Sequence, residues 1–378
     1  MARLELADSG IMYINSNPAY GYVFASHPHP YQLPNREFVS TYMRGGGLYA
    51  PDLNVGFLRS TDGGVTWADE GLLYDKSGDD RPYSYHNGFL SRMGDGTLVV
   101  LCFRTDRSDP DHPMFSASGG LVETEPILFL SPDDGRTWTG PKSFGLPEGM
   151  IATPSTPVIE LADGSWFVLY DRWHGYDDPG PYRPQMLGFT SRDRGESWGE
   201  DVLVADVSVE GKGFWHGKAI RLSDDRLYTV FWTADMTRPD EGPINLPLHC
   251  SIGDPTGRTW TPPESIGIPG QTNWPAELPD GTIGTIYTAR EAERPGFVVV
   301  LSEDGGKTWD LDNQVLVWDV SGWMHIGIPI PDRYPRSHDT IAFGAPTLTT
   351  TLDGDFYAAW WCTLNSVTHV RWARLRVV

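Results

Sequence analysis

Short apolar runs separated by tight turns recur along the whole chain. Runs such as Thr97–Phe103 and Ser165–Tyr170 are rich in β-branched and aromatic residues, which favours strands over helices. Short turns join such runs within residues 94–97, 162–165, 223–226, 279–282 and 352–355; four of them contain Asp-Gly and the one at 223–226 contains Asp-Asp. An Asp-Gly pair between two strand-like runs is typical of a β-hairpin. The pattern therefore predicts an all-β fold built from hairpins.

A second motif, Ser-x-Asp-x-Gly-x-x-Trp, follows the hairpins. Copies start at Ser60, Ser131, Ser191 and Ser302, and a stretched copy starts at Ser251, with start-to-start gaps of 71, 60, 60 and 51 residues in chain order. We interpret the motif as a turn: the Asp and Ser side chains cap backbone N–H groups, Gly adopts a positive φ, and Trp fills an apolar slot. Its aspartates are expected to be structural and not catalytic.

The two motifs together define six units in 378 residues, about 63 residues each. Each unit has the order strand, Asp-Gly turn, strand, loop, strand, Ser-x-Asp motif, strand. The last unit ends with a third strand at His369–Leu375, and the N-terminal residues Arg3–Leu6 can supply its fourth. The sequence predicts a six-bladed β-propeller of four-stranded antiparallel blades, one domain over residues 1–378, closed by the N-terminal strand.

Repeated Ser-x-Asp-x-Gly-x-x-Trp motifs on six blades resemble the sialidase (neuraminidase) superfamily with its Asp-box, or BNR, repeats. The resemblance covers essentially the whole chain. It implies that the motifs lie on one face and the active site on the other, at the starts of innermost strands and the ends of second strands. The expected active-site face includes Asn17–Tyr20 and five arginines at second-strand ends: Arg44, Arg104, Arg107, Arg172 and Arg290.

The resemblance also implies catalytic groups: an arginine triad for the sialic carboxylate, a Tyr–Glu nucleophile and an Asp acid/base. Tyr287–Arg290 resembles a segment with a triad arginine. The segment from Tyr42 to Asn54 resembles the acid/base segment, with Asp52 as its nearest carboxylate and Tyr49 as the alternative residue at that place. The chain departs from the family elsewhere. Phe343–Pro346 stands in the region of the nucleophilic Tyr, and Gln271–Pro275 offers no partner Glu. A relative with different catalytic groups is therefore expected.

The candidate catalytic residues on this face are Asp52, His86, Asp171 and His216. His86 and His216 open innermost strands, where an imidazole can act as acid or base near neutral pH; the alternative is a hydrogen-bonded wall residue. Glycoside hydrolysis needs two carboxylates, and Asp52 and Asp171 are chosen among the rim carboxylates. Less favourably placed histidines are His27, His29, His112, His325 and His338.

The candidate substrate-binding residues combine cations and aromatic rings: Arg44, Arg104, Arg172, His174, Trp215, Trp274 and Arg290. Arginine presents a planar fork to a carboxylate. Indole faces stack on the apolar faces of sugars, although packing between blades is the more frequent role of a Trp.

Charge and composition narrow the class of partner. The chain has 29 Lys and Arg against 50 Asp and Glu, a formal net charge of −21, which argues against binding nucleic acid or anionic lipid. Three cysteines, Cys102, Cys250 and Cys362, do not form a disulfide framework or zinc pattern, and no cofactor is indicated. No signal peptide is visible, so a cytoplasmic location is expected unless a leader has been removed.

Three functions remain open at this point. The first is a glycoside hydrolase of the sialidase superfamily, exo-acting on a terminal, acidic sugar. The second is a polysaccharide lyase that uses Arg172 or Arg290 to neutralise a uronate and His86 or His216 to move the proton. The third is a propeller that binds a glycan or a protein without catalysis.

Overall fold

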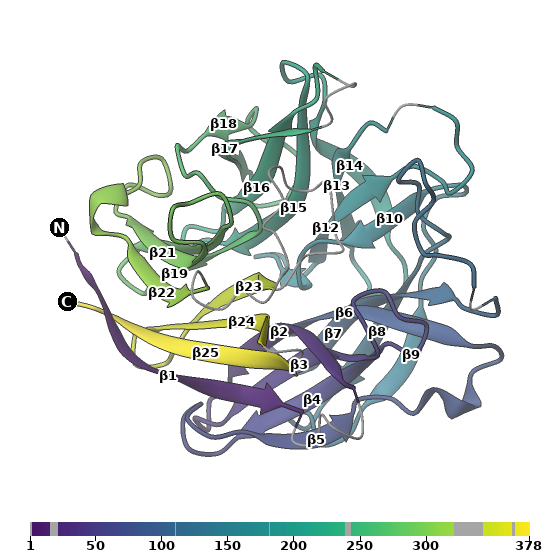
Figure 1. Ribbon diagram of the computed structural model, residues 1–378, viewed down its shortest axis with the longest axis horizontal. Coiled ribbons are helices and arrows are strands. Elements are labelled where there is room, and N and C mark those ends of the chain that lie inside the picture. The colour runs from purple at the N-terminus through teal and green to yellow at the C-terminus, as the bar shows by residue number, and fades with distance from the viewer. Residues whose placement is uncertain are drawn as a thin grey trace.

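The computed structural model describes residues 2–15, 22–109, 111–180, 182–238, 243–320, 343–364 and 367–378. Their strands form six antiparallel sheets around a central axis (Figure 1), which confirms the predicted six-bladed β-propeller. Two short 3₁₀ helices, η1 (Lys76–Gly78) and η3 (Leu311–Asn313), lie in connections between strands. Within the described ranges, no helix has the length and hydropathy needed to cross a membrane.

Each blade begins with its innermost strand and continues outward. The first blade contains β2 (Phe24–Gln32), β3 (Phe38–Gly45), β4 (Asn54–Ser60) and β5 (Ala68–Leu72). The second contains β6 (Tyr83–Arg92), β7 (Leu98–Asp106), β8 (Glu125–Ser131) and β9 (Thr139–Ser143). The third contains β10 (Ile151–Pro154), β11 (Ile159–Glu160), β12 (Trp166–Trp173), β13 (Gln185–Ser191) and β14 (Gly199–Asp206). Because β10 and β11 both pair with β12, the innermost strand of this blade is split.

The remaining blades follow the same order. The fourth contains β15 (Lys212–Arg221), β16 (Leu227–Asp235), β17 (Ile244–Gly253) and β18 (Glu264–Ser265). The fifth contains β19 (Asn273–Glu277), β20 (Ile283–Ala289), β21 (Gly296–Ser302) and β22 (Val315–Asp319), and the sixth contains β23 (Phe343–Thr350), β24 (Phe356–Leu364), β25 (Val367–Val377) and β1 (Leu4–Ile14). Successive strands of a blade alternate in direction, so the second strand of each blade ends at the face where the innermost strands begin. We call this face the mouth.

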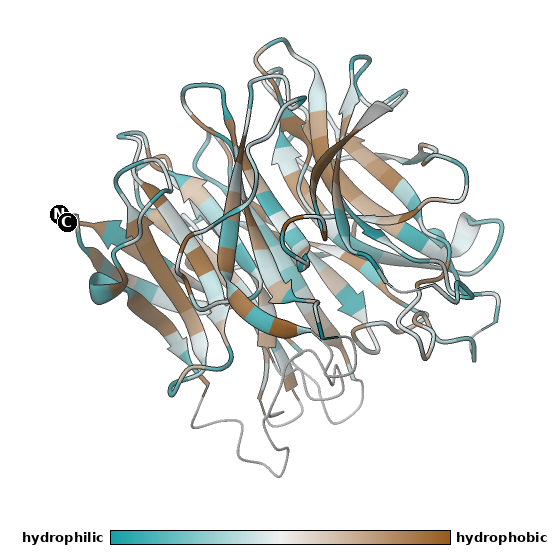
Figure 2. Cartoon of the chain, turned by 90° about the horizontal axis from the view of Figure 1, so that it is seen from above, coloured by the Kyte–Doolittle hydropathy of each residue, from teal (hydrophilic) through white to brown (hydrophobic). Residues whose placement is uncertain are grey.

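The N-terminal strand completes the last blade, as predicted. β1 pairs antiparallel with β25 from Leu4 opposite Val377 to Ile14 opposite His369, a longer pairing than Arg3–Leu6 alone. The two ends of the chain therefore lie side by side (Figures 1 and 2). This pairing covers the edge of β25, which would otherwise present unpaired N–H and C=O groups.

The Ser-x-Asp motifs form the turns that the sequence predicts. In the first copy Ser60 donates to Asp62, Gly64 N–H donates to the Ser60 hydroxyl at 2.9 Å, and Thr66 N–H donates to Asp62 at 2.9 Å. The Trp67 indole donates to the Gly64 carbonyl at 3.0 Å. The motif aspartates are thus occupied by their own turns, on the face opposite the mouth.

Apolar side chains fill every interface between neighbouring blades. Strand segments are mainly hydrophobic and the loops mainly hydrophilic in Figure 2. One hydrophobic cluster lies at each interface, and each cluster contains side chains from both neighbouring blades. Starting at the interface of the first and second blades and following the ring, representative pairs are Val39 with Val100, Leu128 with Val168, Leu169 with Phe231, Val230 with Ile283, Phe297 with Trp360, and Tyr42 with Tyr357. Full burial of such a side chain contributes about 1.5–3 kcal/mol, so these six interfaces hold the ring together.

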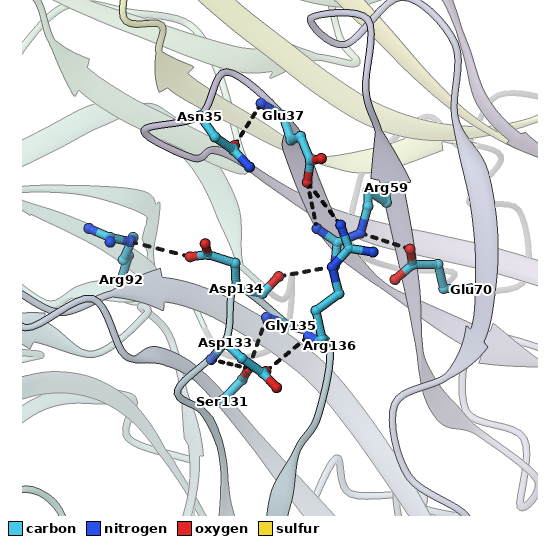
Figure 3. Close-up of polar contacts among 10 residues, drawn as sticks. All are labelled: Asn35, Glu37, Arg59, Glu70, Arg92, Ser131, Asp133, Asp134, Gly135 and Arg136. Atoms are coloured by element: carbon cyan, nitrogen blue, oxygen red, sulfur yellow. Dashed lines mark hydrogen bonds and ion pairs between the residues drawn. The ribbon is translucent and has the colours of Figure 1, made fainter.

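Charged groups connect the first two blades on the face opposite the mouth (Figure 3). The Arg59 guanidinium contacts Glu70 at 2.7 Å, Glu37 at 3.1 Å and the Asp134 carbonyl at 3.0 Å. Arg136 adds a contact to Glu37 at 3.4 Å. Arg59 is 4% exposed, and each of its nitrogens donates to an oxygen, so its buried charge is fully compensated.

Candidate functional site

Four innermost strands each have a β-bulge at the mouth. His27, Asn87, His216 and Ala345 all have positive φ, with 52° for His27 and 50° for His216, and each lies at a bulge in its strand. A bulge redirects the side chains around it, and positive φ is costly for residues other than glycine. The strand irregularity is therefore concentrated where the innermost strands surround the axis.

Asp171 and His216 form the best-organised polar pair at the mouth. Asp171 is 2% exposed and accepts hydrogen bonds from the Ser155 hydroxyl at 2.6 Å and from the His216 backbone N–H at 2.9 Å. Its Oδ2 atom also lies 3.3 Å from Nδ1 of His216, whose side chain is 36% exposed. Because a carboxylate only accepts, this contact favours a proton on Nδ1 and leaves Nε2 available at the open side.

The Asp171 carboxylate is held in its ionised form. Burial alone would raise the pKa of Asp171, but His216, the Ser155 hydrogen bond and the Lys218 charge together hold that pKa below its usual range. Within the described ranges, Asp171 is the one acidic residue whose side chain is buried. The pair thus has an anionic, fixed member and a partly exposed imidazole.

Lys218 fills the axis below this pair. Its ammonium donates to the Ser155 carbonyl and lies 4.8 Å from the Phe89 ring centre and 5.4 Å from that of Trp274. The His29 ring contacts the same two aromatic rings. Burial lowers the pKa of Lys218 to about 8, although the Asp171 charge opposes this shift. Residues from five blades therefore meet around a cation that is held against aromatic faces.

His86 lies near His27 at the mouth. His86 is buried, stacks on Phe103 and hydrogen-bonds the Ser84 hydroxyl at 2.8 Å through Nε2. Burial, with a contribution from nearby cations, lowers the pKa of both His86 and His27 to about 3. Both imidazoles are therefore neutral near pH 7. His27, which the sequence ranks among the less favourably placed histidines, lies at a bulge and close to His216 and Lys218.

Two further cations stand near His86. Arg107, directly after β7, is 5% exposed, and its Nε atom has no hydrogen-bond partner. The Lys76 ammonium donates to the carbonyls of Asp52, Leu53 and Tyr83. The mouth of this acidic protein therefore concentrates positive charge.

Arg44 and Arg104 point away from this cluster. Arg44 forms an ion pair with Asp69 of the outermost strand β5 at 2.9 Å. Arg104 pairs with Glu125 on the neighbouring strand β8 at 2.6 Å and lies over the Tyr83 ring. Each charge is neutralised inside its own blade, so the structure does not bring either arginine to the Asp171–His216 pair.

Arg172 and Arg290 also have local partners. Arg172 is exposed and donates to the Gln185 side chain on β13 at 2.8 Å. Arg290 donates to Gln271 at 2.7 Å and to the Phe343 carbonyl, and it lies over the Phe343 ring. Arg290 thus joins the fifth and sixth blades at the mouth.

Asp52 is separate from the buried pair. It is exposed in the loop between β3 and β4, where its side chain accepts a hydrogen bond from Gly46 N–H at 2.9 Å. The sequence-predicted residues Asn17–Tyr20, His325 and His338 lie outside the described residues.

Aromatic rings line the mouth across four blades. Their order is Tyr49, Phe115, Trp173, Tyr182, Trp215 and Trp232, with successive ring centres 5.0, 5.7, 5.6, 6.3 and 5.9 Å apart. The row ends beside the His216 ring, which stacks 5.9 Å from Trp232. His174, whose ring nitrogens have no hydrogen-bond partner, contacts Tyr182.

Comparison with known proteins agrees with this architecture. The model of the BNR repeat-like domain family matches residues 37–316, well over half of the chain. The chain belongs to the BNR repeat-like family.

This BNR repeat-like protein is similar to one curated sialidase in sequence and to several solved structures in fold. A sialidase from Micromonospora viridifaciens is 25% identical over 248 residues, covering 62% of this chain; the match spans 33% of that protein's length. A protein of unknown function from Dyadobacter fermentans has a TM-score of 0.75 at 16% identity, with 99% of both chains covered. An α-L-arabinanase from Penicillium chrysogenum has a TM-score of 0.61 at 16% identity, covering 99% of this chain and 98% of that one. The solved structures establish the shared fold.

The sequence alone assigned no role to Ser155, Tyr182 or Lys218 of this BNR repeat-like chain, and it ranked His27 among the less favourably placed histidines. One pattern in the sequence marks the bulges: each of the four bulge residues with positive φ precedes Pro or Gly, as in His27-Pro28 and His216-Gly217. Within the described ranges, no group of three or more His, Cys, Asp or Glu has an arrangement that could hold a metal ion.

Proposed function

We propose that this protein is a glycoside hydrolase that removes a terminal, anionic sugar from an oligosaccharide at the mouth of the propeller. The observation that carries the proposal is the Asp171–His216 pair, with its partly exposed imidazole and the half-buried cation Lys218 beside it. Relatives described as a sialidase and an α-L-arabinanase support glycoside cleavage.

His216 is proposed as the acid/base group of the reaction. Nδ1–H faces the Asp171 carboxylate, so Nε2 of the neutral imidazole has a lone pair for the incoming water. Nε2 takes a proton from the water as the water oxygen bonds to the anomeric carbon and the bond to the leaving oxygen breaks. The leaving oxygen takes up a proton from solvent, and His216 then returns its proton to solvent. Asp171 acts as a positioning residue that fixes the imidazole and stabilises its charged form.

The surroundings of the pair suit an anionic sugar. Lys218 lies beside the pair and supplies positive charge. Arg107 adds a buried cation near His86 at the same mouth, and the half-buried rings of Phe115, Trp173 and Tyr182 lie at this mouth too.

The test is incubation with sialosides, uronides and arabino-oligosaccharides, followed by detection of new reducing ends. With the best substrate, we expect His216→Gln to lower kcat/KM by about 100- to 10,000-fold and Asp171→Asn by about 100-fold. Asp353→Asn, on a turn of the opposite face, is the matched control and should leave kcat/KM unchanged. No new reducing ends with any substrate would reject the hydrolase.

A second candidate, β-elimination on a uronate, is favoured by the chemistry of the same pair. Asp171 is engaged as an acceptor, whereas His216 and the nearby Tyr182 are groups that can move protons. Burial and the nearby Asp171 charge raise the pKa of Tyr182, so its phenol stays protonated. An ultraviolet-absorbing unsaturated uronate product would establish elimination, and its absence alongside new reducing ends would establish hydrolysis.

A further inference from the structure

The described part of the chain contains two buried arginines with opposite surroundings. Arg59 and Arg107 are 4% and 5% exposed. Arg59 contacts two carboxylates and a carbonyl on the face opposite the mouth (Figure 3). Arg107 has no ion pair among the described residues, and its buried Nε atom donates to nothing.

An unpaired buried cation is costly, because its lost hydration is not replaced. This chain has 50 acidic residues, and every other arginine compared above has a carboxylate, amide or carbonyl partner. The absence of such a partner at Arg107 is therefore a local property of the mouth and not a shortage of acidic side chains.

Arg107 lies at the mouth end of the second blade, close to His86. It follows the last residue of β7 and its backbone N–H donates to the Pro82 carbonyl at 2.8 Å, directly before β6 begins. Lys76 lies at the same end of the blade and donates to the Tyr83 carbonyl. The Lys76 ammonium already donates to backbone carbonyls, so Lys76 contributes positive charge but no hydrogen-bond donor to a ligand. Arg107 contributes both positive charge and N–H donors. The Arg107 charge also contributes to the low pKa of His86.

We infer that Arg107 is the anion-binding residue of the mouth and that its guanidinium receives the carboxylate or sulfate group of an acidic sugar. This inference rests on the proposed function for the type of ligand. The guanidinium fork matches an oxyanion with two parallel N–H donors. Arg44 and Arg104 cannot take this role while Asp69 and Glu125 neutralise them.

The test compares Arg107→Met with Arg59→Met for stability. Methionine keeps much of the side-chain volume and removes the charge. Removal of an uncompensated charge should leave Tm unchanged or raise it by about 1–3 °C. Arg59→Met should lower Tm, because it leaves Glu70 without its cation and Glu37 with Arg136 alone. A fall in Tm for Arg107→Met as large as that for Arg59→Met would overturn the inference.

Binding is measured in the same proteins by calorimetry with glucuronate, inorganic sulfate and uncharged glucose. We expect binding of at least one anion and about 10- to 100-fold weaker binding by Arg107→Met. Arg107→Lys should recover part of the affinity, and Arg136→Met, on the opposite face, should match the wild type. Preference for glucuronate over sulfate identifies a carboxylated sugar, and the reverse a sulfated one.

Equal anion affinity in wild type and Arg107→Met, or no anion binding by the wild type, would overturn the inference. Binding is read without turnover, so the outcome is separable from the proposed hydrolysis. Arg107-dependent binding with no cleavage of any substrate would retain the anion site and reject the enzyme.

Discussion

At the scale of single residues, burial decides which charged groups at the mouth are available to a ligand. Asp171 is ionised and occupied, His86 and His27 are neutral, and Lys218 is a cation with a depressed pKa. These states follow from the balance between lost hydration and local partners. The mouth is therefore prepared for a negatively charged group at neutral pH.

The positive charge at the mouth depends on pH because of Lys218. Its pKa of about 8 means that the ammonium is charged below pH 8 and loses its proton as the pH rises through that value. We expect KM for an anionic substrate to increase between pH 7 and pH 9, because attraction is lost. Neither His86 nor His27, with pKa values of about 3, titrates in this window.

The check is a KM profile of the wild type and of Lys218→Met. The variant should have a raised KM that no longer changes between pH 7 and pH 9. A wild-type KM that stays constant over the same range would contradict the role assigned to Lys218.

At the scale of structural elements, the Ser-x-Asp turn combines hydrogen bonding with close packing. The last glycine before the Trp has φ of 83° at Gly135, and a Cβ there would lie 2.6 Å from the Phe57 ring of the preceding blade. The turn thus needs glycine both for its backbone and for the approach of the neighbouring blade.

A pair of substitutions separates these two needs. Gly164, in a hairpin turn, has φ of 81°, but a Cβ added there would meet no atom within 4 Å. Gly164→Ala should cost about 1 kcal/mol from backbone strain, and Gly135→Ala about 2–4 kcal/mol because Phe57 must also move. Urea denaturation measures both; equal losses would show that packing at the turn is unimportant.

The same turns predict a loss of stability in acid. Partial burial would raise the pKa values of Asp62, Asp254 and Asp304, but hydrogen bonds from motif hydroxyls and backbone N–H groups lower them to about 2. An unfolded Asp has a pKa near 3.9, so the unfolded chain binds more protons in this range. Stability from these groups is present above about pH 4 and is lost as the pH falls toward 2.

Asp304→Asn tests this linkage because the amide keeps an acceptor without titrating. The variant should be less stable than the wild type at pH 6 and should lose less stability between pH 4 and pH 2 in thermal unfolding. Identical acid profiles would exclude Asp304 as a contributor.

At the scale of the whole molecule, closure by β1 turns a row of blades into a ring. β1 contributes the buried residues Leu4 and Met12 to its interfaces and the hydrogen bonds that cover β25. Closure holds the sixth blade against the first, and this arrangement fixes all innermost strands around one axis.

Deletion of residues 2–14 should therefore reduce stability by at least about 3–6 kcal/mol, the burial energy of those two side chains. It should also cause self-association through the exposed strand edge. Thermal unfolding and size-exclusion chromatography measure these effects. Leu6→Ala, at a side chain that is 45% exposed, is the control and should change stability by less than about 0.5 kcal/mol. A monomeric deletion variant with wild-type Tm would contradict closure by β1.

Much of this architecture was predictable from sequence, because turn chemistry repeats along the chain. The Asp-Gly turns and Ser-x-Asp motifs specify blade number and strand order without knowledge of distant contacts. The site was less predictable. Arg44 and Arg104 look like ligands in the sequence, but Asp69 and Glu125, 25 and 21 residues away, neutralise them. His27 reaches the mouth because of a bulge, whose backbone angles follow from tertiary packing.

The most direct test of the account is a crystal structure with an oligosaccharide that ends in a uronate. We predict that the terminal sugar lies at the mouth, with its carboxylate on Arg107 and its glycosidic linkage beside Nε2 of His216. A sugar bound away from the axis, with Arg107 and His216 untouched, would contradict the account.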